Sequence, residues 1–558
     1  MWIFRVVIML VAGIPIFSFL GAVLLYTVRP VGALLFDWSA ITFDHYLSVA
    51  TDEYTLGLAV NTFLYVAASL TVGSILTVTF TWLVQRSDLP YRHLIPSIMI
   101  IPLAIPGAFI AFGWVLLASP RTGLLNLWLR GLLGMSGTGP LDIYTYWGMV
   151  LLTSLNLVPS MFFMLNSQLR NMDSALEEAG SVCGAPVHSV ARYITLPMMT
   201  PALAASGIYF LIQLIETFEI PLVLGLNANF RVFSTHIFFL ARPDLDEPQY
   251  GVAAVFATFL TIGGLGLTYF YMRLTRASYK YITIRGQRSA PHPVRLGRWK
   301  VAAVGFVCLY LAVKVVLPFI ALLWMSLFEI WRPPSLEALG QVSLKNYAYV
   351  LQDPRWGRAF ANTVILVVTA STGNVLLAGL IAWAAVRDPS ARARWLLDWL
   401  AFLPRSLPNI VMALAVLVLL LRTPLYGTIW VIVIAHIFNY LAYTSRVFIS
   451  SVIQIHPELE EAARLSGVRR AGVLRWIVLP LLRPAILNAW LWVAAHSIRD
   501  FTYPLMLGTM QNMVIANLLW QTWIIVQMER AAAITVMLMG MLFLFVIPHY
   551  YFMRRHRV

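Results

Sequence analysis

"EEAARLSGVRRAGVLRWIVLP" (residues 460–480) is a polar, charged stretch in a chain that is otherwise mostly apolar, and a second stretch, "EEAGSVCGAPVHSVARYITLP" (residues 177–197), has the same plan. In both stretches a glycine, Gly467 or Gly184, follows Glu-Glu-Ala five residues after the alanine. The proline of a Leu-Pro pair comes thirteen residues after that glycine in each. The shared residues and spacing predict that the two stretches form the same local structure.

The composition surrounding these stretches is that of a membrane protein. Of 558 residues, 60% are hydrophobic and 11% are charged, and the mean hydropathy is +0.78. Soluble domains carry roughly 25% charged residues. Apolar runs of about 20 residues, the length needed to cross a bilayer as a helix, predict an all-α polytopic membrane protein with twelve spans. The predicted spans are 6–28, 57–83, 94–118, 146–166, 201–225, 250–272, 301–327, 359–385, 396–421, 428–450, 482–507 and 531–553.

The net charge of +15 is explained by topology rather than by nucleic-acid binding. If the N-terminus is cytoplasmic, the inside segments contain 25 Lys and Arg residues and the outside loops contain 11. This is the positive-inside bias, which favours anionic lipid headgroups as the partner of these charges. We therefore expect a bacterial inner (plasma) membrane protein with several spans and both termini in the cytoplasm, and no nucleic-acid partner.

The chain is predicted to consist of two repeated halves joined by a basic linker. Residues 273–300 contain eight Lys or Arg and no acidic residue, and landmarks on either side recur at nearly constant offset. Six spans in each half place both halves in the same orientation, so we expect two parallel six-helix pseudo-repeats. The predicted units are residues 1–272, the cytoplasmic linker 273–300 and residues 301–558. Matched landmarks are Asn61 and Asn362, Trp82 and Trp383, Arg86 and Arg387, Pro106 and Pro408, Gly184 and Gly467, and Pro221 and Pro504.

The two polar stretches occupy the same inside loop in each half, at about residues 170–200 and 453–483. Ser174 in the first loop, and His456 with Pro457 in the second, are placed to begin a short helix whose first turn contains the acidic pair. Both helices are expected to end at the glycine, which adopts the left-handed conformation of a helix end. The sequence therefore predicts a short helix, a turn and a second helix in each loop. A solvated loop without further role is the alternative that one copy alone would allow.

These paired loops resemble the EAA loop of binding-protein-dependent ABC importer permeases, and the resemblance covers the whole chain as two fused six-span cores. It implies that each loop docks on an ATPase subunit, so that two copies of that subunit, and a periplasmic or extracellular solute-binding protein, are expected partners. The chain has no Gly-x4-Gly-Lys-Ser/Thr motif, so we expect ATP and magnesium to bind to the ATPase partner. We expect no enzymatic activity, no catalytic residue and no cofactor in this chain. The implied coupling residues are Glu177, Glu178, Ala179, Gly184, Glu460, Glu461, Ala462 and Gly467.

A translocation pathway or gate is predicted where the fifth span of each half carries charges. The stretches "IETFEIPLVLG" (residues 215–225) and "IRDFTYPLMLG" (residues 498–508) superpose at offset 283. Charges in a membrane interior are costly and normally face protein, so we expect these side chains near the axis between the halves, with an internal ion pair between Glu216 and Arg499, a gate, or both. The predicted pathway residues are Glu216, Glu219, Pro221, Arg499, Asp500 and Pro504. Lys314 has no assigned role, and no metal ligands can be named.

The sequence is compatible with several substrates. Two fused cores with "ETFEIPLVLG" after the first loop resemble ferric-iron permeases and their thiamine-type relatives, which implies ferric iron or a related small solute. Carboxylates suit a hard cation, whereas Arg499 favours an anion or a chelate. Thiamine, polyamine, phosphonate and sulfate-like solutes therefore stay open. A twelve-span secondary transporter and a polytopic membrane enzyme are the alternatives from other classes.

Overall fold

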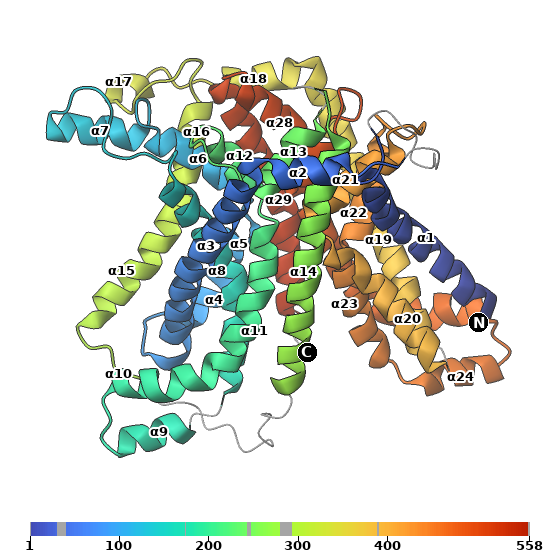
Figure 1. The fold of residues 1–558 in the computed structure, drawn as a ribbon. Helices are drawn as coiled ribbons and strands as arrows, with labels where there is room; N and C mark the ends of the chain where they lie inside the picture. The colour runs from blue at the N-terminus through green and yellow to red at the C-terminus, as the bar shows by residue number, and fades with distance from the viewer. Residues whose placement is uncertain are drawn as a thin grey trace.

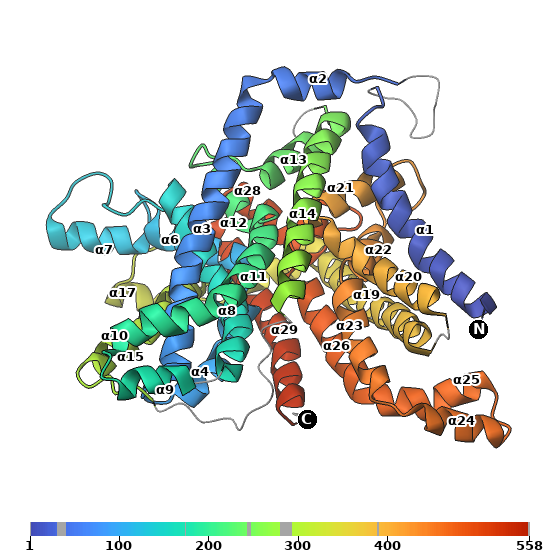
Figure 2. The same cartoon turned by 60° about the horizontal axis from the view of Figure 1, so that its bottom comes forward.

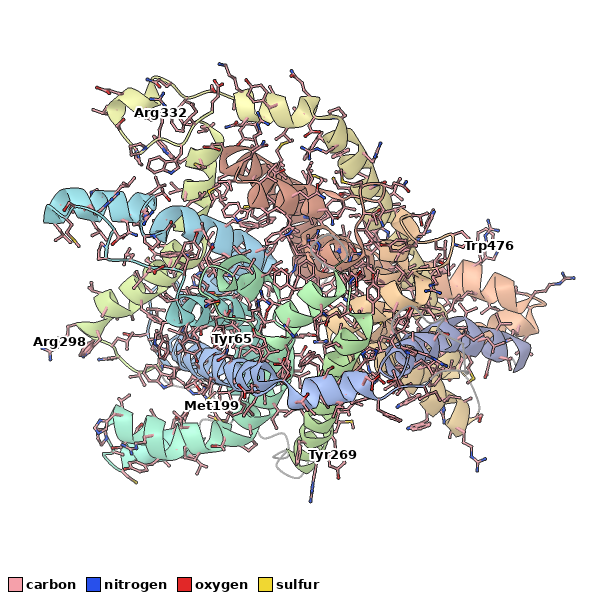
Figure 3. The ribbon with its side chains drawn as sticks, turned by 45° about the horizontal axis from the view of Figure 1, so that its top comes forward. Tyr65, Met199, Tyr269, Arg298, Arg332 and Trp476 are labelled. Atoms are coloured by element: carbon pink, nitrogen blue, oxygen red, sulfur yellow. The ribbon has the colours of Figure 1, made fainter. Side chains whose placement is uncertain are left out.

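The computed structural model describes residues 2–30, 41–172, 175–242, 247–278, 293–387 and 390–555. Ser174 and half of the linker, residues 279–292, lie outside this range. The described residues form helices (Figure 3), and an isolated β-bridge joins Ser87 to Val294. The predicted all-α polytopic architecture is confirmed (Figure 1).

Nine helices in the described ranges are long and apolar enough to cross a membrane, and three bent helix pairs raise the number of candidate spans to twelve. The predicted number is therefore reached when each bent pair is counted as one span. The nine are α1 (Trp2–Tyr26), α3 (Glu53–Arg86), α8 (Tyr146–Asn171), α11 (Leu196–Ile215), α14 (Tyr250–Ser278), α15 with α16 (Trp299–Leu311 and Leu317–Ser326), α19 (Pro354–Arg387), α26 (Leu479–Arg499) and α29 (Met528–Arg555).

The bent pairs coincide with the predicted spans at 94–118, 396–421 and 428–450, and the bends themselves were not predicted. The third span of each half is broken by 83° and 98°, and the fourth span of the second half by 47°. Ile105 and Leu407, which precede Pro106 and Pro408, are extended with ψ of 122° and 127°, because a residue before proline avoids the helical region. The pairs are α5 (Ile100–Ala104) with α6 (Gly107–Ala118), α20 and η5 (Ala391–Phe402 and Leu403–Ser406) with α21 (Asn409–Leu420), and α22 (Ile429–Asn439) with α23 (Leu441–Ile453).

The order and length of the elements repeat between the halves. The second spans, α3 and α19, each have 34 residues, and the outer arms of the broken third spans, α6 and α21, each have 12. A π-helical turn precedes the fifth span in both halves, η2 (Ala191–Thr195) and η6 (Leu474–Val478). Short helices then follow the fifth span, α12 (Glu219–Gly225) and α27 (Thr502–Leu507). The duplication seen in the sequence is thus a duplication of backbone structure.

The first span of each half packs against the other half. Helix α1 contacts α20 and α21, and α16 contacts α6 in the corresponding way. Trp114 in α6 donates its indole N–H to the carbonyl of Val313, 3.0 Å away. A Cβ on Gly113 would come within 2.5 Å of Pro318, so a glycine is needed for this approach. The halves are therefore interlocked, and the unit boundaries of the sequence analysis stay a prediction.

The polar loops of the two halves project from one face of the bundle. They form α9 (Ala175–Val182) with α10 (Val187–Val190), and α24 (Pro457–Leu465) with α25 (Arg470–Val473), at opposite sides of that face (Figures 1 and 2). At the other end lie α2 (Asp44–Thr51), α13 (Phe233–Ala241), α18 (Lys345–Gln352) and α28 (Ile515–Ile524). The polar loops and the loops predicted to be outside are thus separated by the length of the spans.

Candidate functional site: paired loop helices and a central cavity

The two loop helices, α9 and α24, end in the same way. Gly184 and Gly467 have φ of +82° and +83°, the left-handed conformation expected for them. The next residue donates its backbone N–H to the carbonyl five residues earlier, at 3.1 Å from Ala185 to Gly180 and at 3.0 Å from Val468 to Ala463. This bond is the hallmark of the Schellman helix end. The predicted stop at glycine is confirmed in both loops, and His456 and Pro457 occupy the expected first positions of α24.

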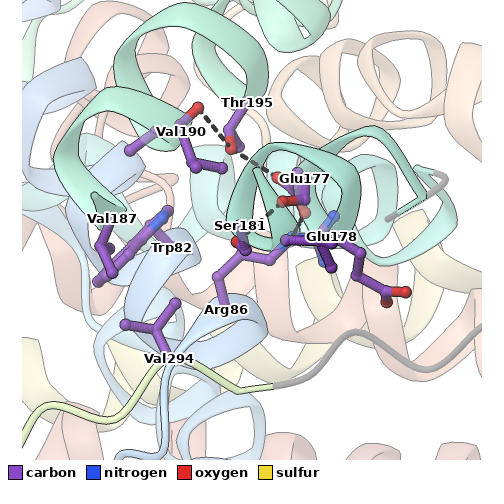
Figure 4. A pocket seen from close by; sticks show the side chains of 11 residues that line it. Trp82, Arg86, Glu177, Glu178, Ser181, Val187, Val190, Thr195 and Val294 are labelled. Carbon is purple, nitrogen blue, oxygen red and sulfur yellow. Dashed lines mark hydrogen bonds and ion pairs between the residues drawn. The ribbon is translucent and has the colours of Figure 1, made fainter. Parts of the chain in front are cut away.

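The first glutamate of each acidic pair anchors its loop helix to the second span. Glu177 accepts a 2.7 Å contact from Nε of Arg86, at the end of α3, and Glu460 accepts a 2.7 Å contact from Nε of Arg387, at the end of α19. The two glutamates are only 8% and 4% exposed. Thr195 also donates its hydroxyl to Glu177 at 2.5 Å (Figure 4). Because the pairs are buried, each loop helix is tied firmly to a membrane span.

The second glutamate of each pair and the alanine after it are oriented differently. Glu461, Ala179 and Ala462 are exposed and Glu178 is half-buried, pointing away from Arg86 in Figure 4. The predicted coupling residues thus divide into buried anchors and outward-facing side chains. Arg86 and Arg387 recur in the sequence, but no local pattern pairs them with the glutamates, because the partners are 91 and 73 residues apart along the chain.

Both loop helices expose apolar side chains at matching positions. Val182 and Leu465 are 88% and 90% exposed, and Leu176 and Leu459 are exposed one to two turns earlier. Val182 lies six positions after Leu176, and Leu465 lies six positions after Leu459, so the spacing is identical in the two loops. Exposed apolar residues repeated on a polar face are typical of a surface that another protein covers.

One departure between the loops has a packing explanation. Gly180 stands where the second loop has Ala463, and a Cβ on Gly180 would lie 2.7 Å from Cδ1 of Ile194. Helix α9 therefore approaches the following turn more closely than an alanine allows without a shift of that side chain. The difference is one of local packing, and the helix end is unchanged.

The end of the linker adds a contact that only the first loop has among the described residues. Val294 exchanges backbone hydrogen bonds with Arg86 and Asp88 at 2.9 and 3.0 Å, and it lines a cavity of about 270 Å³ with α9 and α10 (Figure 4). Asp88 accepts hydrogen bonds from Lys300 at 2.8 Å and from the N–H of Leu296 at 2.9 Å. The hydrogen bond from Lys300 is the main cause that lowers the pKa of Asp88 below its usual value. The end of the linker, residues 294–300, is thus fixed beside the first loop.

A second cavity, of about 420 Å³, lies between the halves where the third and fifth spans are broken. The structure brings four of the six predicted pathway residues to it, namely Glu216, Glu219, Arg499 and Asp500. Further polar side chains from the fifth spans and from neighbouring spans complete the lining, including Asn156, Gln213, Asn409, Asn439, Tyr440 and His496. Such a volume is in the range of small-molecule sites.

The expected ion pair between Glu216 and Arg499 is wrong in this structure. Glu216 contacts Arg405 at 3.2 Å and accepts the backbone N–H of Asn409 at 2.9 Å, whereas Arg499 donates to the carbonyl of Leu103 at 2.9 Å. The reason lies in the repeat: Glu216 and Arg499 are equivalent positions, and each faces the broken third span of the opposite half. Leu103 and Arg405 are equivalent as well, at offset 302. Two equivalent contacts therefore join the halves.

The remaining carboxylates bind helix ends within their own half. Glu219 accepts the backbone N–H of Ala108 at 2.9 Å, in the first turn of α6, and Asp500 accepts that of Tyr503 at 3.1 Å, at the start of α27. Nε2 of buried His436 lies 3.0 Å from Asp500. Negative charge at a helix N-terminus is favourable because the N–H groups there have no helical partner.

The two predicted prolines lie behind the cavity. Pro221 and Pro504 are buried in α12 and α27 and do not line the cavity. Each helix break falls at the residue four positions before the proline, because the proline ring clashes with the carbonyl of that residue in a continuous helix.

Lys314, left unassigned by the sequence, is fully buried and donates to Asn156 at 2.5 Å. Arg405, His436 and Asn156 were missed because nothing in the sequence places their spans beside the fifth spans.

No group of three or more His, Cys, Asp or Glu residues that could hold a metal ion occurs in residues 2–30, 41–172, 175–242, 247–278, 293–387 and 390–555. Each of the cavity's three carboxylates is engaged by protein donors in this structure. The arrangement can therefore lock the halves together and can offer hydrogen bonds to a solute.

Comparison with known proteins shows which families the chain resembles. Residues 374–558 match the family model described as "Binding-protein-dependent transport system inner membrane component". A putative ferric transport system permease of Haemophilus influenzae is 24% identical over 82% of this chain and 71% of its own length. A ferric transport system permease of Actinobacillus pleuropneumoniae is 27% identical over 70% of this chain, which matches only 56% of that relative, and a second Haemophilus influenzae permease for Fe(3+) is 23% identical over 81% of each.

These relatives and the family model agree with the resemblance that the paired loops carry in the sequence. The matched family consists of inner membrane components, and the structure has the many apolar helices that such a component requires. The chain is thus a multi-pass membrane protein similar to binding-protein-dependent ABC importer permeases, and its residues 374–558 match the family of binding-protein-dependent transport system inner membrane components.

Proposed function

We propose that this permease imports ferric iron or a related small solute, driven by two ATPase subunits that dock on its two loops. The docking proposal rests on the structural similarity of the two loop helices. Each has a buried Arg–Glu anchor to a second span, a Schellman end and exposed apolar residues at the same two positions. A rigid helix fixed to a span transmits motion of a bound partner to the membrane bundle.

The orientation proposed from the charges agrees with this role. Both described chain ends, Trp2 and Arg555, belong to spans whose ends lie toward the face of the loop helices (Figure 1). We place that face in the cytoplasm with the ATPase subunits, and ATP and magnesium on those subunits. The outside loops near 29–56, 226–249 and 328–358 would then receive the solute-binding protein.

The central cavity is the proposed pathway, and the two contacts between the halves are its gate. Separation of the halves would break the Glu216–Arg405 contact and the Arg499–Leu103 hydrogen bond together, since both cross the same interface. Glu219 and Asp500 line the opened path, and Pro221 and Pro504 keep the helix breaks in place.

Ferric iron is the solute named for the relatives reported above, which is the support for that choice. Radiolabelled ferric iron uptake into proteoliposomes that contain the permease, ATPase subunits and binding protein tests it. Uptake of thiamine, a polyamine, a phosphonate or sulfate in the same assay, with no ferric uptake, would replace the substrate and leave the importer class intact.

Reversal of the outward-facing charges tests the docking proposal. Replacing both Glu178→Lys and Glu461→Lys should leave the protein inserted, reduce uptake more than tenfold and separate ATP hydrolysis from transport. The matched control is the double replacement by aspartate, which keeps the charge and should retain most uptake. Normal uptake in the lysine variant would reject the docking assignment, and uptake driven by a proton gradient without ATPase subunits would indicate a secondary transporter.

A further inference from the structure

A short amphipathic helix, α7 (Leu124–Leu133), fills a loop that is longer in the first half than in the second. The third and fourth spans are joined by residues 119–145 in the first half and by residues 421–428 in the second. Helix α7 projects sideways from the bundle beyond α6 and α3 in two views (Figures 1 and 2). The second half joins the equivalent spans without such a helix, so the repeated architecture does not explain why α7 is present.

One side of α7 is fixed to the returning loop. The side chain of buried Asn126 donates to the carbonyls of Ser119 and Leu141 at 2.9 and 2.7 Å and accepts the N–H of Leu141 at 2.9 Å. Arg130 donates to the carbonyls of Arg121 and Gly137. The one charged residue of α7 and its buried amide are thus used internally, and they hold the helix in one orientation.

The other side of α7 is an exposed apolar stripe. Trp128 and Leu132 are 64% and 62% exposed and lie four positions apart on one face of the helix, and Met135, just beyond the helix end at Gly134, is exposed as well. Leu133 is exposed beside them. No described part of the chain covers this stripe, although its loop is ordered by the hydrogen bonds above.

We propose that this stripe, Trp128, Leu132, Leu133 and Met135, rests on the lipid of the outer leaflet at the membrane–water interface. The connectivity places it there, because α7 follows the outer arm of one span and precedes the outer start of the next, α8. Exposed Trp147 at the start of α8 and exposed Phe63 in the neighbouring α3 belong to the lipid-facing side of these spans. The stripe extends that surface sideways.

The side chains fit this partner. Tryptophan is enriched at membrane interfaces, and an amphipathic helix there buries its apolar face among headgroups and acyl chains while its polar face stays in water. The returning loop contains the exposed polar residues Ser136, Thr138 and Asp142, which would face the water. A soluble partner that binds and leaves would expose the stripe to water between encounters, whereas lipid covers it continuously.

Environment-sensitive labels at single cysteines test the proposal. Cys183→Ser and Cys308→Ser remove the native thiols, and the second loop already has a serine, Ser466, at the position of Cys183. An NBD label at Leu132→Cys, in full-length permease in phosphatidylcholine nanodiscs, should show blue-shifted emission and be quenched at least threefold by lipids with a doxyl group near the headgroup. The matched label at Thr138→Cys should be quenched by iodide and not by doxyl lipid.

A label at Trp128→Cys provides a second position if the Leu132 variant is poorly folded. Quenching of both stripe labels by iodide, without an effect of doxyl lipid, would overturn the lipid assignment. Shielding that appears only after addition of the solute-binding protein would overturn it as well and identify the stripe as a protein-docking surface. Because no ATPase or solute is needed, the result is independent of the proposed transport function.

Discussion

The loop helices and the fifth-span breaks are both duplicated, but they have diverged to very different degrees. Glu177 and Glu460 make the same contact at the same distance with equivalent arginines, and their helices end at glycines with nearly identical φ. At the breaks, Glu216 is opposite Arg499 in the repeat, and their partners are a side chain in one case and a carbonyl in the other. This difference fits the proposed docking, in which the two loops meet two identical subunits and stay alike, whereas the breaks meet each other and are free to differ.

The largest expected effect comes from breaking an anchor. Arg86→Ala and Arg387→Ala each leave a buried glutamate without its cation, which costs about 3–5 kcal/mol for a buried pair. We expect uptake to fall more than tenfold in each variant while the amount of the variant in the membrane stays normal, and we expect the two decreases to agree within about twofold. Exchange of the pair as Arg387→Glu with Glu460→Arg is the control for charge. Normal uptake in one single variant only would show that the two loops are not equivalent.

The gate contacts should respond unequally. Arg405→Gln removes an ion pair with Glu216, whereas Arg499→Gln removes a single hydrogen bond to a backbone carbonyl. We expect the first to raise the ATPase rate without binding protein at least threefold and the second to change it less than 1.5-fold. Restoration of the low rate by the exchange Arg405→Glu with Glu216→Arg would support the pair. Equal effects would mean that the ion pair has no special role.

The helix ends should respond equally and more weakly. Gly184→Ala and Gly467→Ala place a Cβ on a left-handed residue, which costs roughly 1–2 kcal/mol, and neither Cβ meets another atom within 4 Å. We expect each to weaken binding of the ATPase subunit about threefold to tenfold in a nanodisc titration. Asparagine tolerates this conformation better and is the matched control. A large difference between the two sites would contradict the equivalence of the loops.

The smallest effect concerns the linker contact of the first loop. Asp88→Asn removes the charge that Lys300 contacts, so hydrogen exchange at residues 293–298, corrected for the intrinsic rate, should rise several-fold while the second loop is unchanged. Since the pKa of Asp88 is lowered in the folded protein, the contact is present above the ordinary value of about 3.9 and is lost as the pH falls through the lower, folded value. Unchanged exchange in the variant would show that the backbone bonds of Val294 are sufficient.

Local signals in the sequence predicted the repeat, the loop helices and their glycine ends, because spacing, capping and turn residues act over a few positions. Pro221 and Pro504 are local signals of the same kind, since each lies four positions after a helix break. The anchors, the Glu216–Arg405 contact and the buried Lys314–Asn156 bond depend on which spans are neighbours, and no short pattern encodes that. Pro106 and Pro408 were recognised as landmarks, but length and hydropathy alone concealed the bends that they cause. The roles assigned to the individual residues stay predictions.

The contacts between positions 103 and 499 and between 216 and 405 also restrict which halves can assemble. In a pair of two first halves, Glu216 would face the leucine at position 103, leaving two carboxylates without cations in the membrane interior. In a pair of two second halves, Arg405 would face Arg499, which places like charges together. Only one half of each kind satisfies the interface, so joining them in a single polypeptide supplies both in equal number and in reach of each other during synthesis.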